Sequence, residues 1–440
     1  DYRTFHLPKP SWIDELSYLI PARLGADQPL QCHSDDFSSM NYGAIVYKKT
    51  AAVFGFLKQY LGEERFDKAM QTYFEDWKFK HPSPSDLQAS MEKSCGEDLS
   101  WFFNGWIKTD EINNWAICKA KKADDTVEIT LKNIGGQTSP AEVVVYNDEE
   151  IIGSSWASPS APGTKTTVKV QASNSTHVII DPNRFDLDYD RTNNYSRTSG
   201  LLKRIEPLQI KMYSRLEDGN KTQLFWMPAS GWNAHNGNMV GVAIHNVALP
   251  MRNLEWHVAP LVGFKNDISL NGTTSISYST GNWNARGRLS KFSSRDVSRI
   301  DSTILTEQIA PNHRLSFELS RKFNKFVNSP WSSKLEYEYA MRFGFVYDHE
   351  NANENPMRDS HKLRFDTHNS NDKIVTLEQN LGVELRYFNF QYFGNEYIEP
   401  PLIKDNQNLV SMINYNVSNR INKSGDKVKL SLLGAYIYNF

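Results

Sequence analysis

The chain has 440 residues, which is long enough for two or three domains, and its formal net charge is −2. With a sequence pI of about 6.6 it has no basic field, so we expect no nucleic-acid partner. The three cysteines, Cys32, Cys95 and Cys118, are widely spaced, which excludes a CxxC metal site and argues against a disulfide framework. No run of about 18 apolar residues predicts a transmembrane helix, although alternating membrane strands would escape that test.

Residues 42–109 predict a compact run of helices. From Tyr47 to Leu61 apolar residues recur at three- and four-residue intervals, which is typical of one face of an amphipathic helix. Gly62 follows the last of them and suits a C-terminal cap. Residues 66–77 repeat the helical spacing with a stripe of aromatic side chains, which predicts a second helix.

Two more helices are predicted after a proline stop. Pro82 and Pro84 end the second helix, because proline lacks the donor N–H and disfavours helix in the residue before it. Ser85 is placed to cap a third helix, and Asp98 to begin a fourth that contains Trp101. The density of aromatic residues predicts a packed core, and nothing in this pattern by itself requires an active site.

A set of short motifs in a fixed order runs through these helices. They are Tyr47-Lys48-Lys49, Leu61-Gly62-Glu63-Glu64-Arg65-Phe66, Tyr73-Phe74, Asp86-Leu87 and Asp98-Leu99-Ser100-Trp101-Phe102. Over about residues 37–110 the chain resembles the gluzincin aminopeptidases, the family of aminopeptidase N and the leukotriene hydrolases, at the helical end of their catalytic domain. The resemblance implies a thermolysin-like zinc-peptidase fold, aminopeptidase activity and a peptide substrate.

Tyr47 is the candidate catalytic residue that this resemblance implies. In the family, a tyrosine in a Tyr-Glu-Lys-Gly context donates its phenol to the oxyanion of the tetrahedral intermediate, and a phenol donates while neutral at pH 7. Tyr47 and Lys49 match that context, whereas Lys48 and Thr50 replace its Glu and Gly. Read from the residues alone, Tyr47 is a helix-initiating aromatic residue packed against Phe37 or Tyr42.

The zinc motif of the family does not occur in this chain. None of the 11 histidines stands in a His-Glu-x-x-His sequence, and the nearest approach is His349-Glu350-Asn351. In the family this motif precedes the tyrosine, and only 46 residues precede Tyr47. We therefore expect the chain to be the C-terminal part of a longer protein that holds Zn²⁺ through ligands before Asp1. We expect no metal ligand in this chain, and no activity from the chain alone.

A short β region follows the helices. Its candidate strands are residues 127–131, 143–145, 167–170 and 178–180. Glycine and proline clusters at 135–136 and 159–163 separate them. About 65 residues with four or five strands predict a small antiparallel sandwich. The resembling family often carries such a module after its helical part.

An acidic run ends this module. It contains Asp181, Asp186, Asp188 and Asp190. Two interpretations are open, a Ca²⁺ site and a solvated acidic linker. The spacing matches no calcium loop, which favours the linker.

From about residue 205 apolar and polar residues alternate over long stretches. The clearest run is 335–345, and 315–319 and 375–387 repeat the pattern, the last with Gln379 interrupting its apolar stripe. The two longer runs, of about 11–13 residues, exceed the five or six of a typical strand. They match the roughly 9–11 residues that a tilted membrane-spanning strand needs. The pattern predicts a C-terminal antiparallel membrane β-barrel of about 10–12 strands.

Two features complicate the strand boundaries. Pro228, Pro250, Pro260 and Pro311 fall in or beside candidate strands, where they predict bulges or turns because proline removes a ladder hydrogen bond. The segment 283–310 is polar and rich in arginine. We interpret it either as a long loop or as strands that line a barrel lumen.

The last predicted strand ends the chain on an aromatic residue. Its apolar face carries Val428, Leu430, Leu432, Gly434, Tyr436, Tyr438 and Phe440. Aromatic rings at a strand end are typical of the girdle at a membrane interface. The ending at Phe440 resembles the C-terminal signature of bacterial outer-membrane proteins, which implies outer-membrane lipid and the barrel-assembly machinery as partners. A soluble antiparallel β domain is the alternative.

Together these patterns predict a multidomain α+β protein. Residues 1–120 would be the helical C-terminal part of a gluzincin catalytic domain, 121–195 a small β-sandwich module with its linker, and 205–440 an outer-membrane-type β-barrel. The parent protein would be a zinc metallopeptidase held at the outer membrane of a Gram-negative-type bacterium. Its peptidase domain would be periplasmic or surface-exposed.

Two other classes of function stay open. In the first, the barrel serves transport or assembly and carries a degenerate peptidase-derived module for gating or docking, which Lys48 and Thr50 favour. In the second, the chain is a soluble binding protein.

Overall fold

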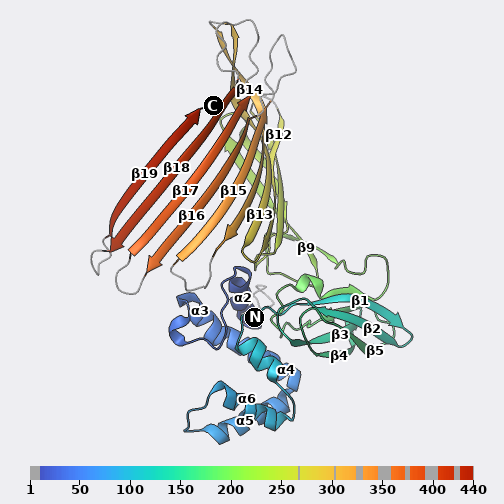
Figure 1. Cartoon of the computed structure of the whole chain (residues 1–440). Helices are drawn as coiled ribbons and strands as arrows, with labels where there is room; N and C mark the ends of the chain where they lie inside the picture. The colour runs from blue at the N-terminus through green and yellow to red at the C-terminus, as the bar shows by residue number, and fades with distance from the viewer. Residues whose placement is uncertain are drawn as a thin grey trace. The chain divides into compact units, whose positions relative to one another are not determined.

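The computed structural model describes residues 10–265, 268–301, 304–323, 331–344, 358–371, 377–391, 405–420 and 427–439. The chain divides into two compact units, which Figure 1 shows along the chain from blue to red. The first is Asp1–Gln209 with Arg215–Gln223, and the second is Ile210–Ser214 with Leu224–Phe440. Among the residues that the structure describes, no helix is both long and apolar enough to span a membrane.

The first unit begins with helices. Their bounds are α2 (Pro10–Arg23), η1 (Ser34–Asp36), α3 (Ser39–Gly43), η2 (Ala44–Lys49), α4 (Thr50–Leu61), α5 (Glu63–Trp77), α6 (Pro84–Cys95) and η3 (Phe102–Ile107); η2 and η3 are π-helical turns and η1 is a 3₁₀ turn. The helix predicted from Tyr47 to Leu61 is confirmed as the end of η2 followed by α4, and Gly62 ends it with φ of 82°. The predicted helix 66–77 is confirmed within α5.

The prediction that Ser85 caps the third helix is wrong by two residues. Ser83 precedes α6 with an extended backbone, and Asp86 accepts hydrogen bonds from the Ser83 N–H at 2.8 Å and from its hydroxyl at 2.6 Å. Ser85 therefore lies inside the first turn. Asp98 acts as predicted, because its Oδ1 accepts the Ser100 N–H at 2.8 Å ahead of η3.

Aromatic rings fill the core of the helical part. The ring of Phe56 in α4 meets Trp106 of η3 edge-on at 5.9 Å between centroids, and both side chains are almost fully buried. Trp156, from the following β module, packs against Phe56 and Tyr60 at 6.2 and 5.2 Å. The helices and the module of the first unit therefore share one hydrophobic contact region.

The β module has seven strands in two antiparallel sheets. They are β1 (Trp115–Ala123), β2 (Thr126–Asn133), β3 (Ser139–Asn147), β4 (Glu150–Ser160), β5 (Lys165–Gln171), β6 (His177–Ile180) and β7 (Tyr195–Arg197), in the orders β1-β2-β5 and β4-β3-β6-β7. Buried side chains of both sheets form one core, which confirms the predicted sandwich. The prediction of four or five strands is too low, since the lysine-rich β1 and the serine-rich β4 lack a clean apolar alternation. Pro159, predicted as a breaker, lies inside β4.

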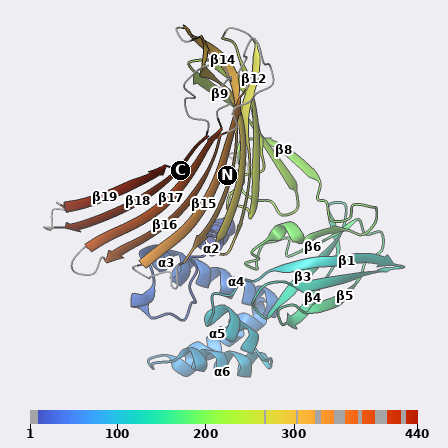
Figure 2. The same ribbon diagram turned by 45° about the horizontal axis from the view of Figure 1, so that its top comes forward.

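The second unit is one twelve-stranded sheet. Its strands are β8 (Leu208–Met212), β9 (Thr222–Asn233), β10 (Gly237–His245), β11 (Leu254–Gly263), β12 (Ser269–Thr280), β13 (Trp283–Asp301), β14 (Ile304–Lys322), β15 (Trp331–Gly344), β16 (Arg358–Asn371), β17 (Leu377–Gln391), β18 (Asp405–Arg420) and β19 (Lys427–Asn439). Each strand pairs with its neighbour in sequence, and the pairs from β9 to β19 are antiparallel. The predicted antiparallel strands are confirmed, but β8 and β19 are the two edges, so the described sheet is not closed as a barrel. Figure 2 shows it as a curved, open surface.

The polar segment 283–310 belongs to the sheet. It forms β13 and the first part of β14, each 19 residues long, so the loop interpretation is wrong. Pro228, Pro260 and Pro311 lie inside strands, whereas Pro250 lies in the β10–β11 connection.

Two glycines make room for Pro260. A Cβ at Gly241 would lie 1.9 Å from the Pro260 carbonyl oxygen, and Gly272, opposite Pro260 on β12, has φ of 146°. Only residues without a side chain fit there, which explains how a proline is tolerated in the middle of this sheet.

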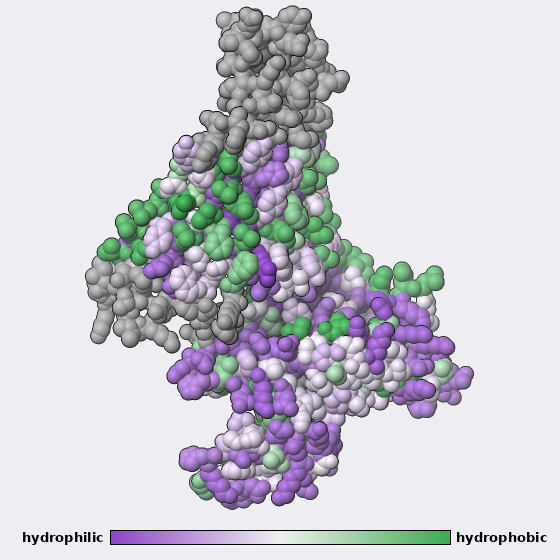
Figure 3. All heavy atoms as spheres, in the orientation of Figure 1, coloured by the Kyte–Doolittle hydropathy of each residue, from purple (hydrophilic) through white to green (hydrophobic). Residues whose placement is uncertain are grey.

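The two faces of the sheet differ in chemistry. Cross-strand pairs such as Leu335 with Phe365, and Leu363 with Leu385, place apolar side chains on one face, where they are 37–43% exposed. The opposite face carries ion pairs. Figure 3 shows hydrophobic residues gathered over the sheet and hydrophilic residues over the first unit. The predicted alternation is confirmed within the described residues.

Some sequence predictions fall outside the residues that the structure describes. They are Asp1, Phe345, His349-Glu350-Asn351, the start of the 375–387 run and the terminal Phe440.

Candidate functional site

Tyr47 lies on the π-helical turn η2, immediately before α4. The turn is wider than an α-helix, because the Thr50 N–H and hydroxyl both donate to the carbonyl oxygen of Ile45, five residues earlier. Such turns are rare and often occur at functional sites. The Tyr47 side chain is 62% exposed, so its phenol is accessible to a ligand.

A chain of aromatic rings supports one side of Tyr47. Its ring meets that of Tyr42 edge-on at 6.2 Å, and Tyr42 meets Phe37 in the same way at 6.5 Å. The prediction that the Tyr47 ring packs against Phe37 or Tyr42 is therefore confirmed for Tyr42. The contact involves the ring and leaves the oxygen free, since no described residue hydrogen-bonds the phenol of Tyr47.

Lys49 anchors the turn that carries Tyr47. Its Nζ lies 2.7 Å from Asp27 Oδ2 and donates to the carbonyl oxygen of Gln28 at 3.2 Å. The same Nζ lies 5.2 Å from the centre of the Tyr18 ring on α2. Burial raises the pKa of Asp27, although the Lys49 charge acts against that rise. The helical turn is therefore tied by a charge-assisted hydrogen bond to the segment that follows α2.

A second polar contact holds the same segment. The side-chain amide of Asn41 donates to the Ala26 carbonyl at 2.6 Å and to Gln28 Oε1 at 2.9 Å, and Asn41 is 1% exposed. Sequence reasoning named Lys49 but missed Asp27 and Asn41. No local pattern links Asp27 to a lysine 22 positions later, because the contact exists only after the chain folds.

The residues described in this chain do not fit a zinc site. No group of three or more His, Cys, Asp or Glu side chains among them is arranged to hold a metal ion. A catalytic zinc needs three protein ligands and one open position. The described part of the chain therefore supplies no set of ligands that could hold a zinc ion near the exposed Tyr47.

The acidic run is neither a calcium site nor a solvated linker, so both interpretations need correction. Arg191, which is 4% exposed, lies 3.1 Å from Asp181 Oδ2 and 3.0 Å from Asp186 Oδ1. Its Nε also lies 2.7 Å from Glu15 Oε1 on α2. These carboxyl groups surround a buried arginine and tie α2 to the loop after β6.

Burial perturbs the carboxyl groups of this cluster in different directions. It raises the pKa of Asp188 to about 7 and the pKa of Asp181 well above its usual value. Burial acts the same way on Glu15, but the charges of Arg191 and Arg184 outweigh it and leave the pKa of Glu15 below its usual value. The cluster is thus a structural junction in which burial and the arginine charges together determine which carboxyl groups are protonated.

Comparison with known proteins finds a family match that includes Tyr47. Residues 23–106 match the Peptidase family M1 domain. The aminopeptidase N of Lactococcus lactis subsp. lactis is 26% identical over 146 residues, which are 30% of this chain and 17% of that protein. The aminopeptidase N of Streptomyces lividans is 33% identical over 93 residues, 21% of this chain and 11% of that protein. Residues 23–106 form an M1 aminopeptidase-like region.

The chain spans less than a fifth of the length of these curated relatives. Among solved structures, a loop L8 deletion mutant of OmpT, an outer membrane protein of Vibrio cholerae, matches 74% of this chain and 97% of its own. The identity is 8% and the TM-score 0.27, which is too low to carry a structural argument.

Proposed function

We propose that this chain is part of a zinc-dependent aminopeptidase in which the Tyr47 phenol stabilises the oxyanion formed on a peptide substrate. The observation that carries the proposal is the M1 aminopeptidase-like region 23–106, in which Tyr47 is exposed on a π-helical turn. The Zn²⁺ expected of that family would be held by residues outside this chain.

The chemistry asked of Tyr47 is donation of one hydrogen bond. As the scissile carbonyl becomes tetrahedral, its oxygen gains negative charge, and a preorganised donor stabilises that charge more than it stabilises the substrate. A phenol is neutral at pH 7 and gives up no proton beforehand. The buried Lys49–Asp27 pair, 2.7 Å long, would limit movement of the turn and keep the donor in place.

Replacing Tyr47 by phenylalanine in the full-length protein tests this role. Tyr47→Phe keeps the ring against Tyr42 and removes only the hydroxyl, so we expect kcat to fall by about 10²–10³-fold with bound zinc unchanged. The matched control is Tyr73→Phe on α5, which makes the same chemical change and should leave kcat unaltered. Equal turnover in Tyr47→Phe and wild type would remove Tyr47 from the mechanism.

We also propose that the second unit holds the protein in the outer membrane of a Gram-negative-type bacterium. Support comes from twelve mostly long strands with apolar side chains on one face and ion pairs on the other. In a bilayer the open edges β8 and β19 would expose unpaired backbone groups, so we expect the sheet to close there as a barrel, inserted by the barrel-assembly machinery.

Membrane flotation of the full chain tests the anchor. We expect the protein to float with vesicles after a carbonate wash and to be released only by detergent. Recovery of a monodisperse protein in buffer without detergent would contradict the proposal and favour a soluble β domain.

A second candidate function is a membrane barrel for transport or assembly whose peptidase-derived region only gates or docks. Lys48 and Thr50, which replace the Glu and Gly of the family context, favour it. Zinc content and peptide hydrolysis separate the two candidates. One tightly bound zinc equivalent in the full-length protein, together with hydrolysis of a peptide, supports the enzyme. The absence of both bound zinc and hydrolysis supports the gating module.

A further inference from the structure

The polar face of the twelve-stranded sheet contains a hollow into which arginine side chains converge. It lies over the neighbouring strands β12 to β15, which Figure 1 labels, and its volume is about 200 Å³. Its positive charges come from Arg286 and Arg288 on β13 and from Arg314 on β14; we call it the Arg288 hollow. The volume lies below the roughly 300–1,000 Å³ of sites for larger ligands, so it suits a small occupant.

The strand register brings these arginines together on one face. Arg288 lies directly opposite Ser316 of β14, and Ser290, the next residue of that face on β13, lies opposite Arg314. Arg314 is therefore the diagonal neighbour of Arg288, at a separation of roughly 7–8 Å that long side chains can span. Arg286 is the neighbour of Arg288 on the same face of β13. The three guanidinium groups can thus reach one small ligand.

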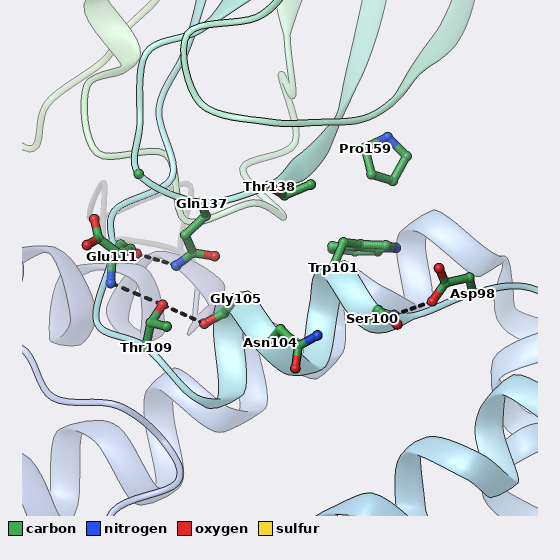
Figure 4. Close-up of a pocket in the computed structure, with 11 residues that line it drawn as sticks. Asp98, Ser100, Trp101, Asn104, Gly105, Thr109, Glu111, Gln137, Thr138 and Pro159 are labelled. Carbon is green, nitrogen blue, oxygen red and sulfur yellow. Dashed lines mark hydrogen bonds between the residues drawn. The ribbon is translucent and has the colours of Figure 1, made fainter.

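A larger hollow in the first unit lacks this convergence. It lies between η3 and the β module, and its volume is about 540 Å³. Figure 4 shows its two carboxylate residues, Asp98 and Glu111, at opposite ends of the helical stretch that contains η3. Its charged groups therefore do not meet at one ligand, as those of the Arg288 hollow do.

Two of the converging arginines have no counter-charge in contact. Among the residues that the structure describes, Arg286 and Arg288 form no ion pair and no hydrogen bond. Elsewhere on the same face charges are paired, as in Arg364, whose Nε lies 2.7 Å from Asp366 Oδ2. The positive charge at the Arg288 hollow is thus left for an anion that the chain does not supply.

The third arginine adds a repulsive contact. Arg314 lies directly opposite Arg342 of β15, and like charges directly opposite each other destabilise a sheet. A bound anion beside Arg314 would offset that repulsion.

Two carboxylates of the lining leave the arginine end of the hollow free. Glu338 is already shared between Arg314, at 3.5 Å, and Lys362 of β16. Glu318 lies opposite Arg286, two residues along β14 from Ser316 and four from Arg314. Three arginines against two glutamates leave the lining with a formal charge of +1. An anion is therefore favoured between Arg288 and Arg314, away from Glu318.

The donors at that end fit a phosphate group. A guanidinium fork matches the oxygens of phosphate, and the hydroxyls of Thr273, Ser290 and Ser316 also line the hollow and can donate. A phosphate group presents at least three acceptor oxygens that point in different directions. A carboxylate presents two oxygens in one plane, so it would leave more of these donors unused.

We propose that the Arg288 hollow binds a phosphate group, either free phosphate or that of a small phosphate monoester. The phosphate lies between Arg288 and Arg314 and accepts hydrogen bonds from Ser290 and Ser316. The site lies within the second unit and uses neither Tyr47 nor zinc, so it goes beyond the proposed peptidase activity and does not depend on it.

Calorimetry on the full chain in a non-ionic detergent tests the proposal. The probes are inorganic phosphate, acetate and glycerol 3-phosphate at equal ionic strength. We expect inorganic phosphate to bind with Kd below about 1 mM and at least tenfold more tightly than acetate. Glycerol 3-phosphate separates the two sources, since tighter binding than that of inorganic phosphate assigns a monoester and weaker binding assigns free phosphate.

A matched pair of variants locates the binding. Arg288→Gln removes a side chain that forms no ion pair or hydrogen bond with the described chain, so the fold is kept while phosphate binding weakens at least tenfold. Arg364→Gln makes the same change on the same face of β16 and should leave Kd within twofold.

Two outcomes would overturn the proposal. In the first, phosphate and acetate bind equally, which would mean that the arginines attract anions without a phosphate site. In the second, Arg288→Gln binds phosphate as wild type does, which would place the anion elsewhere.

Discussion

Lys49 and Asp27 form an ion pair with 2.7 Å between Nζ and Oδ2, and their side chains are 1% and 7% exposed. In the low dielectric of a protein interior, the loss of one partner leaves the other charge unpaired. Tyr47 lies two residues from Lys49 on the same turn. The stability of this pair therefore bears directly on the position of the candidate catalytic phenol.

Removal of the Asp27 charge should be strongly destabilising. Asp27→Asn leaves the Lys49 ammonium buried without a counter-charge, and we expect the free energy of unfolding to fall by about 3–5 kcal/mol. Urea unfolding followed by tryptophan fluorescence measures the change. The control Glu63→Gln removes one partner of the half-exposed Lys58 and should cost less than about 1 kcal/mol. Equal losses in the two variants would show that the Lys49–Asp27 pair is not buried in solution.

Asp188 should make the first unit less stable as pH rises. The folded state binds a proton with a pKa of about 7, whereas the usual value is 3.8. Between those values the folded state holds a proton that the unfolded state has released. The contribution to stability is therefore complete below about pH 4 and is lost as pH rises through 7, by roughly 1.4 kcal/mol per pH unit for one proton.

The variant Asp188→Asn isolates this effect. Asparagine does not titrate, so unfolding free energies measured at pH 5 and pH 7.5 should differ less in the variant than in wild type. Asp190→Asn, two residues away and partly exposed, serves as the control and should keep the wild-type slope. A wild-type slope in Asp188→Asn would assign the pH dependence to another group.

The cap of α6 distinguishes two serines that the sequence could not separate. Ser83 precedes the helix and its N–H and hydroxyl bind Asp86, so Ser83→Ala should cost about 1 kcal/mol. Ser85→Ala lies inside the first turn and should change stability by less than about 0.5 kcal/mol. Thermal unfolding of both variants measures the two losses of stability. A larger loss of stability in Ser85→Ala than in Ser83→Ala would support Ser85 as the helix cap, as the sequence predicted.

Local periodicity explains which parts of the fold could be predicted. The helices α4 and α5 follow from three- and four-residue spacing, because each residue of that pattern contacts neighbours one turn away. Whether Ser83 or Ser85 caps α6 depends on where the extended backbone turns helical, which spacing does not encode. Alternation predicted the two faces of the sheet, but it does not specify whether β8 and β19 pair, since closure depends on strand tilt and register.

Contacts between segments that are far apart in the chain could not be predicted from the sequence. The acidic run was read as solvated because acidic residues are mostly exposed, yet Asp181 and Asp186 are buried around Arg191. Glu15 joins them from 176 positions earlier. Family resemblance supplied Tyr47 and Lys49, whereas Asp27 became recognisable only from its 2.7 Å contact.

The two faces of β16 should respond differently to an added charge. Leu363 is 43% exposed and pairs with Tyr337 and Leu385 on the apolar face, whereas Ser360 pairs with Ala340 on the face that carries the ion pairs. If the apolar face lies against lipid, Leu363→Arg should lower the folding free energy in vesicles by about 2–4 kcal/mol, and Ser360→Arg by less than about 1 kcal/mol. Urea titration of the vesicle-inserted protein measures both. In water an arginine at an exposed position costs almost nothing, so equal stability of the two variants would remove the membrane anchor from the proposed function.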